Sequence, residues 1–241
     1  MARHSSSRHC SSALRPPRIS KTVLVGHLAL FDLDNTLVDR QAVFYRWAES
    51  FVSRRGLGKG AISLLCELDD DGFAPREVVF EATRQRWGLH ESVEELVGEY
   101  RATYLTFYTP DPAVIGALDR LRQAEWRVGV VTNGPTTQHA KLELAGLGDL
   151  VDACCVSDEV GAAKPDRRIF EQAVLRCAGG GRPATSIVMV GDAPGADIGG
   201  GRAMGFRTIW MHRGRTWPLT DYLPDMSVAS VAEAVDNLLA L

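Results

Sequence analysis

The hydrophobic pattern divides the chain into an alternating part and an all-helical part. From residue 111 onward, short apolar runs alternate with longer stretches whose apolar residues recur at helical spacing. The predicted strands are 127–132, 153–157, 186–190 and 207–211, and the predicted helices are 112–124, 136–145, 166–178, 196–204 and 229–240. Such alternation is typical of parallel strands joined by right-handed helical crossovers. The pattern therefore predicts an α/β fold with a doubly wound parallel sheet.

One further strand is predicted near the start of the chain. Residues 28–31, Leu-Ala-Leu-Phe, form an apolar run without alternation. Parallel strands that are covered on both faces show this pattern, because neither side of the strand meets water. We expect this strand to pair with the later block and to belong to the same sheet.

Residues 41–108 between these parts show only helical patterns. The predicted helices are 41–54, 61–68, 75–87 and 91–107. The run Asp69-Asp70-Asp71-Gly72 lacks the ligand spacing of a calcium loop, so it is predicted to be a solvated turn. The predicted organisation is an α/β core of residues 23–40 and 109–241, interrupted by a helical insertion of residues 41–108.

Residues 1–22 are predicted to be a disordered basic tail. They are rich in Ser and Arg, contain Pro16-Pro17 and carry no acidic residue. This composition has too few apolar residues to form a core. Organelle transit peptides are also Ser- and Arg-rich, so import into an organelle is an alternative to a plain tail.

Composition and charge restrict the partners that we expect. The net charge is −3, and residues 27–241 carry 22 Lys and Arg against 30 Asp and Glu. An acidic body disfavours a nucleic acid polymer as partner, and no apolar run approaches the roughly 18 residues of a membrane span. Five cysteines without CxxC spacing predict reduced thiols and a cytoplasmic protein. The sequence makes no prediction of the oligomeric state.

Two carboxylates follow the first predicted strand directly. Asp32 and Asp34 are two residues apart, so in an extended chain they project to the same side. Two ionised carboxylates this close repel each other unless a proton or a cation is shared. The alternative is a structural turn, in which Asp34 and Asn35 form the turn and Thr36 caps the next helix.

Polar residues also follow three later strands. Thr132-Asn133-Gly134 ends one strand, Lys164-Pro165 comes soon after the next, and Asp192 and Asp197 follow the third. Taken singly, these residues are also explained as caps, turn residues or a solvated lysine. Because the carboxyl ends of parallel strands share one edge of the sheet, we expect them to meet. Carboxylates suit Mg²⁺, and a lysine with a hydroxyl suits a transferring phosphoryl group.

In this order, the motifs resemble those of the haloacid dehalogenase (HAD) superfamily, in its helical-cap phosphatase branch with nucleotidase-like and sugar-phosphatase-like members. The resemblance implies that Asp32 is a nucleophile that forms an aspartyl-phosphate and that Asp34 is the general acid/base. It further implies phosphate binding by Thr132, Asn133 and Lys164, and a helical cap formed by residues 41–108. The metal ligands that it implies for Mg²⁺ are Asp32, Asp34 through its backbone carbonyl, Asp192 and Asp197.

The expected function is a Mg²⁺-dependent phosphomonoesterase that hydrolyses a small phosphorylated metabolite of the nucleotide or sugar phosphate class. The dehalogenases of the family lack the second aspartate, so Asp34 favours a phosphatase. Alternatives are a phosphomutase on the same scaffold and a catalytically silent binding or regulatory protein. Cap cations that are candidates to face a second anionic group are Arg46, Arg54, Arg55, Lys59, Arg76, Arg84 and Arg86, although most such charges lie on solvated helix faces.

Overall fold

The computed structural model describes residues 26–58, 60–182, 184 and 186–241. Its centre is a six-stranded parallel sheet of order β3-β2-β1-β4-β5-β6. The strands are β1 (His27–Phe31), β2 (Arg127–Thr132), β3 (Ala153–Val156), β4 (Ser186–Gly191), β5 (Arg207–Met211) and β6 (Met226–Val228). The predicted α/β class and doubly wound parallel sheet are confirmed. The predicted disordered tail, residues 1–22, lies outside the described residues.

β1 occupies the middle of the sheet and is buried on both faces. Its Ala29 and Phe31 belong to one hydrophobic cluster, whereas Leu28 and Leu30 belong to another. Adjacent residues of a strand point to opposite faces, so each face of β1 contributes to a different layer of the core. This arrangement explains the apolar run without alternation.

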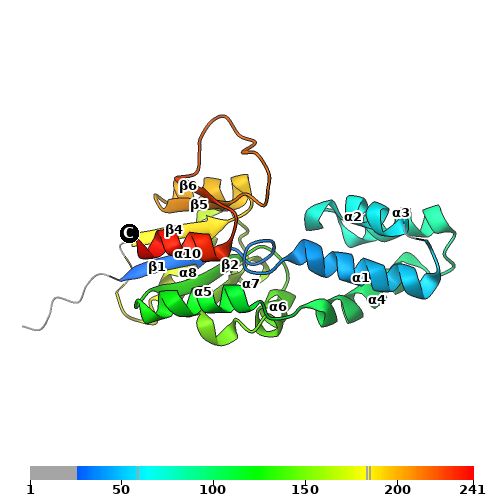
Figure 1. Cartoon of the computed structure of the whole chain (residues 1–241), viewed down its shortest axis with the longest axis horizontal. Helices are drawn as coiled ribbons and strands as arrows, with labels where there is room; N and C mark the ends of the chain where they lie inside the picture. Colours follow the sequence, from blue (N-terminus) through cyan, green and yellow to red (C-terminus); the bar gives the residue numbers. More distant parts are fainter. Residues whose placement is uncertain (1–25, 59, 183, 185) are drawn as a thin grey trace, which may run out of the picture.

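Helices cover both faces of the sheet (Figure 1). On one face, α5 (Pro112–Gln123) and α10 (Val231–Leu239) pack against each other and against the sheet. On the other face lie α8 (Arg167–Cys177) and the short α9 (Gly200–Ala203). The remaining elements of this part are α6 (Thr137–Leu144), η3 (Gly148–Leu150), α7 (Ser157–Val160) and the π-helical turn η4 (Pro194–Gly199). Within the described part of the chain, no helix is long and apolar enough to cross a bilayer.

A group of helices projects from the carboxyl edge of the sheet and is called the cap below (Figure 1). It consists of α1 (Arg40–Arg55), α2 (Gly60–Asp69), η1 (Asp70–Gly72), α3 (Arg76–Trp87), α4 (Val93–Thr103) and η2 (Tyr104–Phe107). Its own core is aromatic, since the Trp47 ring lies 5.0 Å from Phe51, 5.6 Å from Phe80 and 4.9 Å from Tyr100, measured between centroids. The cap therefore has a hydrophobic core separate from those of the sheet.

The prediction of a solvated turn at 69–72 is wrong. Asp69 is only 2% exposed, and its carboxylate accepts two hydrogen bonds of 2.7 Å from Arg40 and one of 2.6 Å from Arg76. Both arginines come from other parts of the cap, so the local sequence around Asp69 does not show that it is paired. The acidic run is a buried ion-pair site at its first residue and a turn only after it.

Two further differences concern the last third of the chain. β6 was not predicted; it is a three-residue edge strand in which Met226 and Ser227 are exposed. The predicted helix 196–204 is divided into η4 and α9. Both differences arise because these segments are too short to show a periodic apolar pattern.

Candidate active site

Asp32 lies at the carboxyl end of β1, where the backbone is held in the sheet. Its N–H donates to the Val190 carbonyl over 2.9 Å, which extends the pairing with β4 by one residue. The buried Lys164 Nζ donates to Asp32 Oδ1 over 2.6 Å and to the Val131 carbonyl over 2.6 Å. The same ammonium lies 2.8 Å from Asp197 Oδ1. Residues from widely separated segments thus converge on one lysine.

Three buried carboxylates form a cluster beside that lysine. Oxygen atoms of Asp32, Asp192 and Asp197 lie within 4.8 Å of one another. Asp197 is fully buried, accepts a 2.9 Å hydrogen bond from the Ala193 N–H, and lies so close to Gly191 that any Cβ there would collide with it. Although Asp197 Oδ1 is near Lys164, no hydrogen bond of good geometry reaches it.

The carboxylates of the cluster lie close enough to repel one another in a buried site. Burial, and repulsion from Asp197 and Asp192, raise the pKa of Asp32 to about 7 despite the attraction of Lys164. Burial and Asp197 likewise raise the pKa of Asp192 to about 6. A divalent cation would relieve this repulsion, and hard carboxylate oxygens around an under-coordinated Asp197 oxygen fit Mg²⁺.

The carboxylate of Asp34 lies in a different environment. Lys141 Nζ donates to Asp34 Oδ2 over 2.6 Å, Gln138 Nε2 donates to the same oxygen over 3.0 Å, and the Tyr108 hydroxyl donates to Oδ1 over 3.4 Å. Burial acts to raise the pKa of Asp34, but Lys141 and Gln138 outweigh burial and lower it. The Asp34 carboxylate is not part of the cluster formed by Asp32, Asp192 and Asp197. The metal ligand that the resemblance implied at Asp34 is its backbone carbonyl, not this carboxylate.

The sequence analysis missed Gln138 and Lys141. Both are buried polar residues, three apart on α6, the helix that follows Thr132-Asn133-Gly134. Their spacing places them on one helix face toward Asp34. In the sequence, two long polar residues at this spacing directly after a candidate site motif were the signal that could have predicted them as site residues.

Thr132 and Asn133 have different roles in the structure. Thr132 is buried, and its hydroxyl accepts a 2.5 Å hydrogen bond from Gln138 Nε2. The Asn133 side chain instead bonds the backbone of Lys164, donating to its carbonyl over 3.1 Å and accepting from its N–H over 2.8 Å. Asn133 therefore positions the Lys164 segment, and its amide is occupied by that backbone.

Two arginines after β5 hold Asp192, and neither was predicted. Arg215 donates to Asp192 Oδ2 over 2.9 Å and to the Asp192 carbonyl over 2.8 Å, and Arg213 donates to Oδ2 over 3.3 Å. Because both use Oδ2, the other oxygen, Oδ1, is left available for a metal ion.

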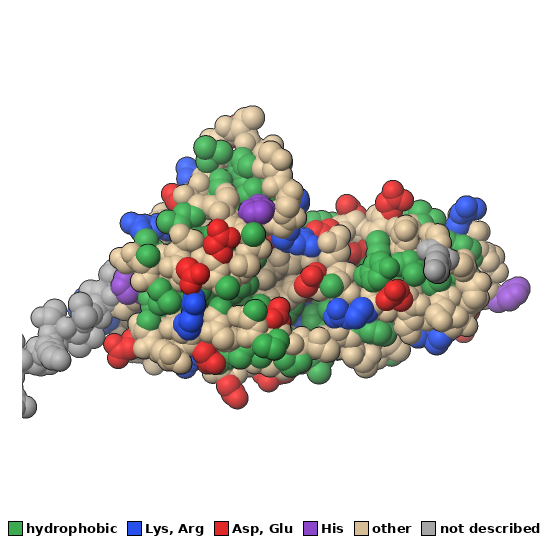
Figure 2. Space-filling view, viewed as in Figure 1, with side chains coloured by type: hydrophobic (Ala, Val, Ile, Leu, Met, Phe, Trp, Pro, Cys, Tyr) green, Lys and Arg blue, Asp and Glu red, His purple; other side chains and the backbone are tan. Residues whose placement is uncertain are grey.

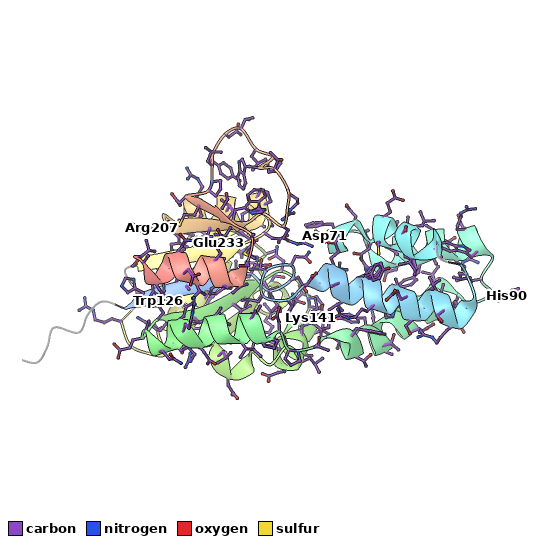
Figure 3. All side chains as sticks on the ribbon, in the orientation of Figure 1. Asp71, His90, Trp126, Lys141, Arg207 and Glu233 are labelled. Carbon is purple, nitrogen blue, oxygen red and sulfur yellow. The ribbon has the colours of Figure 1, made fainter. Side chains whose placement is uncertain are left out.

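Arg213 also joins the core to the cap. It donates to Asp71 Oδ2 over 2.8 Å, while Asn35 donates to Asp71 Oδ1 over 3.0 Å. In Figure 3, Asp71 lies at the junction of cap and core, far from His90 at the outer tip of the cap. Acidic and basic side chains gather at this junction in Figure 2. The Arg213 side chain thus connects Asp71 of the cap to Asp192 of the carboxylate cluster.

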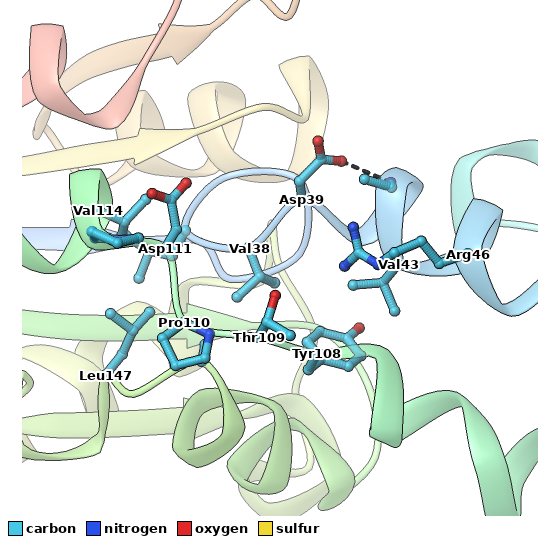
Figure 4. A pocket seen from close by; sticks show the side chains of 14 residues that line it. Val38, Asp39, Val43, Arg46, Tyr108, Thr109, Pro110, Asp111, Val114 and Leu147 are labelled. Atoms are coloured by element: carbon cyan, nitrogen blue, oxygen red, sulfur yellow. Dashed lines mark hydrogen bonds between the residues drawn. The ribbon is translucent and has the colours of Figure 1, made fainter.

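A cavity of about 370 Å³ opens between the cap and the carboxyl edge of the sheet. Its core wall contains Asp32, Asp34, Thr132, Lys164 and the other predicted site residues, and its cap wall is formed by Arg40, Asp71, Gly72 and Phe73. A second cavity, of about 310 Å³, lies at the two linkers between core and cap and shares no lining residue with the first (Figure 4).

Five of the seven cap cations considered for a second anionic group already have partners. Arg46 donates to the Phe107 carbonyl and lines the linker cavity. The remaining paired cations are Arg54 and Arg55 with Glu99, Arg76 with Asp69, and Arg84 with Glu81. Arg86 is exposed, and Lys59 lies outside the described residues. Among these described cations, Arg76 comes nearest to the active-site cavity. It shares its partner Asp69 with Arg40, and Arg40 lines the cavity.

Comparison with known proteins gives the family. Residues 27–205 match the family model of the haloacid dehalogenase-like hydrolases. The chain belongs to this family. It is 32% identical over 208 residues to the phosphoserine phosphatase of Thermus thermophilus, covering 80% of this chain and 78% of the relative. It is 35% identical over 127 residues to the pyrimidine 5'-nucleotidase YjjG of Escherichia coli, covering 52% of this chain and 55% of the relative.

A solved structure supports the fold of this HAD-like hydrolase. The putative HAD-hydrolase YfnB of Bacillus subtilis, which was solved bound to magnesium, superposes with a TM-score of 0.71 at 23% identity, covering 88% of this chain and 98% of YfnB. Together with the family match, the named relatives confirm the predicted enzyme class, a hydrolase of phosphate monoesters.

Proposed function

We propose that this HAD-like hydrolase is a Mg²⁺-dependent phosphomonoesterase that acts through an aspartyl-phosphate on Asp32. The observation that carries the proposal is the contrast between two neighbouring carboxylates. Asp32 lies beside Lys164 and two other buried carboxylates, whereas Asp34 is held ionised by Lys141 and Gln138. Carboxylates whose environments separate their pKa values are suited to different roles in one reaction.

In the first half-reaction, an Asp32 oxygen attacks the phosphorus and the bond to the ester oxygen breaks. Lys164 and the Thr132 hydroxyl orient the phosphoryl oxygens and offset their charge. The departing oxygen takes a proton from Asp34. Asp34 therefore carries that proton at the start of the reaction, and the water of the second half-reaction returns it.

In the second half-reaction, Asp34 removes a proton from water, and the hydroxide attacks the phosphorus of the aspartyl-phosphate. The bond between phosphorus and the Asp32 oxygen breaks, so phosphate leaves and the Asp32 carboxylate is restored. The ionised form of Asp34 is the form that this step requires. Splitting hydrolysis into two displacements replaces one difficult step by two easier ones.

The residues that would hold Mg²⁺ are Asp32, Asp192, Asp197 and the backbone carbonyl of Asp34. When bound, the ion supplies positive charge that offsets the repulsion between the carboxylate nucleophile and the phosphoryl oxygens. Arg213 and Arg215 keep Asp192 in place for this purpose.

Small phosphorylated metabolites are the proposed substrates, in the nucleotide or sugar phosphate class. The named relatives act on phosphoserine and on pyrimidine nucleotides, both of which are small phosphate monoesters. A cavity of about 370 Å³ is at the lower end of the range for small-molecule sites, which suits such a metabolite.

The test is to trap the aspartyl-phosphate. We expect wild-type protein, quenched with acid during turnover of p-nitrophenyl phosphate with Mg²⁺, to carry one phosphoryl group on the peptide that contains Asp32. Asp34→Asn should accumulate this species, because the second step lacks its base. Asp119→Asn, at an exposed position on α5, is the matched control and should behave as wild type. Turnover with no phosphoryl group on Asp32 in any variant contradicts the proposal.

A further inference from the structure

A strained turn in the cap presents an aromatic ring to the active-site cavity. Asp70, Asp71 and Gly72 all have left-handed backbone conformations, with φ of 46°, 53° and 96°. The Phe73 N–H donates to the Asp70 carbonyl over 2.9 Å, which closes the turn. Phe73 lines the cavity that contains Asp32 and Lys164, and 76% of the residue is exposed. It is the most exposed large hydrophobic residue of the described chain.

Contacts on both sides maintain the strained backbone of this turn. Left-handed conformations at residues other than glycine cost on the order of 1–3 kcal/mol each, and they persist where surrounding contacts enforce them. Asp71 is held from the core by Asn35 and Arg213, and Asp69 is held within the cap by Arg40 and Arg76. Such strain is commonly found at functional sites, and here it places an exposed apolar ring against a polar cavity.

The charges around the cavity disfavour a second anionic group on the substrate. Its described lining contains five carboxylates, from Asp32, Asp34, Asp71, Asp192 and Asp197, and two cations, Arg40 and Lys164. Arg40 is bound to Asp69, and Lys164 is bound to Asp32 and lies beside Asp197. The leaving-group end of the cavity therefore offers the Phe73 ring and paired charges. Among the described lining residues, no cation is free to neutralise a carboxylate or a second phosphate.

We propose that Phe73 determines specificity by stacking on a flat ring of the leaving group, and that the preferred substrates are phosphate monoesters of uncharged, ring-bearing alcohols such as nucleosides. This inference rests on the proposed phosphomonoesterase function and adds the substrate class. A ring stacked on Phe73 gains contact area and dispersion without needing a charged partner. Amino-acid phosphates and sugar bisphosphates, which carry a further anionic group, are expected to be poor substrates.

The experiment measures kcat/KM with Mg²⁺ for a nucleoside 5'-monophosphate, glycerol phosphate, phosphoserine and a hexose bisphosphate. We expect the nucleoside monophosphate to be preferred by wild type. Phe73→Ala should lower its kcat/KM about tenfold through KM, in line with the loss of one ring–base stack, and lower that of glycerol phosphate less than about threefold. Phe73→Trp should retain the preference. Val78→Ala, at an exposed apolar cap position outside the cavity, is the matched control and should leave kcat/KM unchanged for both the nucleoside monophosphate and glycerol phosphate.

The outcomes separate the inference from the function on which it rests. Release of phosphate from none of the esters would refute the phosphomonoesterase itself. Release with a preference for phosphoserine or the bisphosphate, or equal losses on the nucleotide and glycerol phosphate in Phe73→Ala, would overturn the role of Phe73 alone. If Phe73→Ala is poorly folded by circular dichroism, Phe73→Leu replaces it, because leucine keeps the apolar bulk and removes the flat ring.

Discussion

The core and the cap both bury charged residues, but they balance those charges differently. In the core, Asp32, Asp192 and Asp197 repel one another in a buried site even though Lys164, Arg213 and Arg215 contact them, and the pKa values of Asp32 and Asp192 are raised. In the cap, Asp69 has two arginines at hydrogen-bond distance, so its charge is fully compensated. A buried carboxylate paired with two arginines serves structure, whereas a buried cluster whose carboxylates still repel one another is suited to bind a cation.

The same contrast separates the two aspartates of one motif. Asp34 is compensated by Lys141, as Asp69 is by its arginines, but Asp34 also lines the cavity. Compensation there favours the ionised form of Asp34, which is the form that the proposed second half-reaction requires. The electrostatic surroundings therefore distinguish the proposed nucleophile Asp32, the proposed base Asp34 and the structural residue Asp69, although all three are aspartates.

Asp32→Asn is the variant with the largest expected effect. An amide cannot form the aspartyl-phosphate, so kcat for p-nitrophenyl phosphate should fall by at least about 1,000-fold. The fold should persist, because the substitution removes a carboxylate from a repulsive cluster. Phosphate release and circular dichroism measure the two quantities. A folded Asp32→Asn protein with near wild-type turnover would show that the cluster does not supply the nucleophile.

Removal of divalent metal is expected to cause the next largest loss of activity. EDTA should lower kcat/KM on the order of 100-fold, and added Mg²⁺ should restore it, because the three carboxylates then lose the cation that offsets their charge. A thermal shift on adding Mg²⁺ to metal-free protein provides a readout that does not depend on activity. Unchanged activity and unchanged melting temperature in metal-free buffer would mean that Lys164, Arg213 and Arg215 compensate the core cluster without a metal ion.

The cap is tested by Asp69→Asn, which leaves Arg40 and Arg76 buried without a carboxylate. Breaking a buried ion pair from one side costs about 3–5 kcal/mol, and urea denaturation should show a loss of that size in the free energy of unfolding. Glu77→Gln is the matched control, because Glu77 pairs with Arg101 on the exposed surface, where side chains are 61% and 66% exposed. That control should cost less than about 1 kcal/mol. Similar small losses in both variants would remove the proposed structural role of Asp69.

The smallest expected effect is at the junction of the two regions. Arg213→Ala removes the link between Asp71 of the cap and Asp192 of the core, so kcat/KM should fall by roughly three- to tenfold because the cap is held against the core less firmly. Hydrogen exchange of the peptide containing residues 69–73 should become faster. Arg168→Ala, which removes an exposed arginine that pairs with Asp166, is the control and should leave both quantities unchanged. Unaltered exchange in Arg213→Ala would show that the cap position does not depend on this link.

The sequence by itself determined the architecture and the candidate site motifs, because both depend on local patterns. Strands 127–132 and 207–211 have the predicted bounds. At the carboxyl edge, Thr132 is the last residue of β2, and Asp32 and Asp192 directly follow β1 and β4. An apolar run ended by polar residues can be recognised from neighbours in the chain. The family resemblance, which comparison confirmed, rested on the same short motifs.

Only the tertiary structure decided which charges are compensated and which side chains face the substrate cavity. Arg213 and Asp71 are 142 positions apart, and Lys141 and Asp34 are 107 apart, so no local pattern links them. The three residues of β6 and the left-handed turn before Phe73 are too short to show periodicity. Charge balance and cavity lining depend on distances in space, and those distances follow from how the sheet and the cap pack against each other.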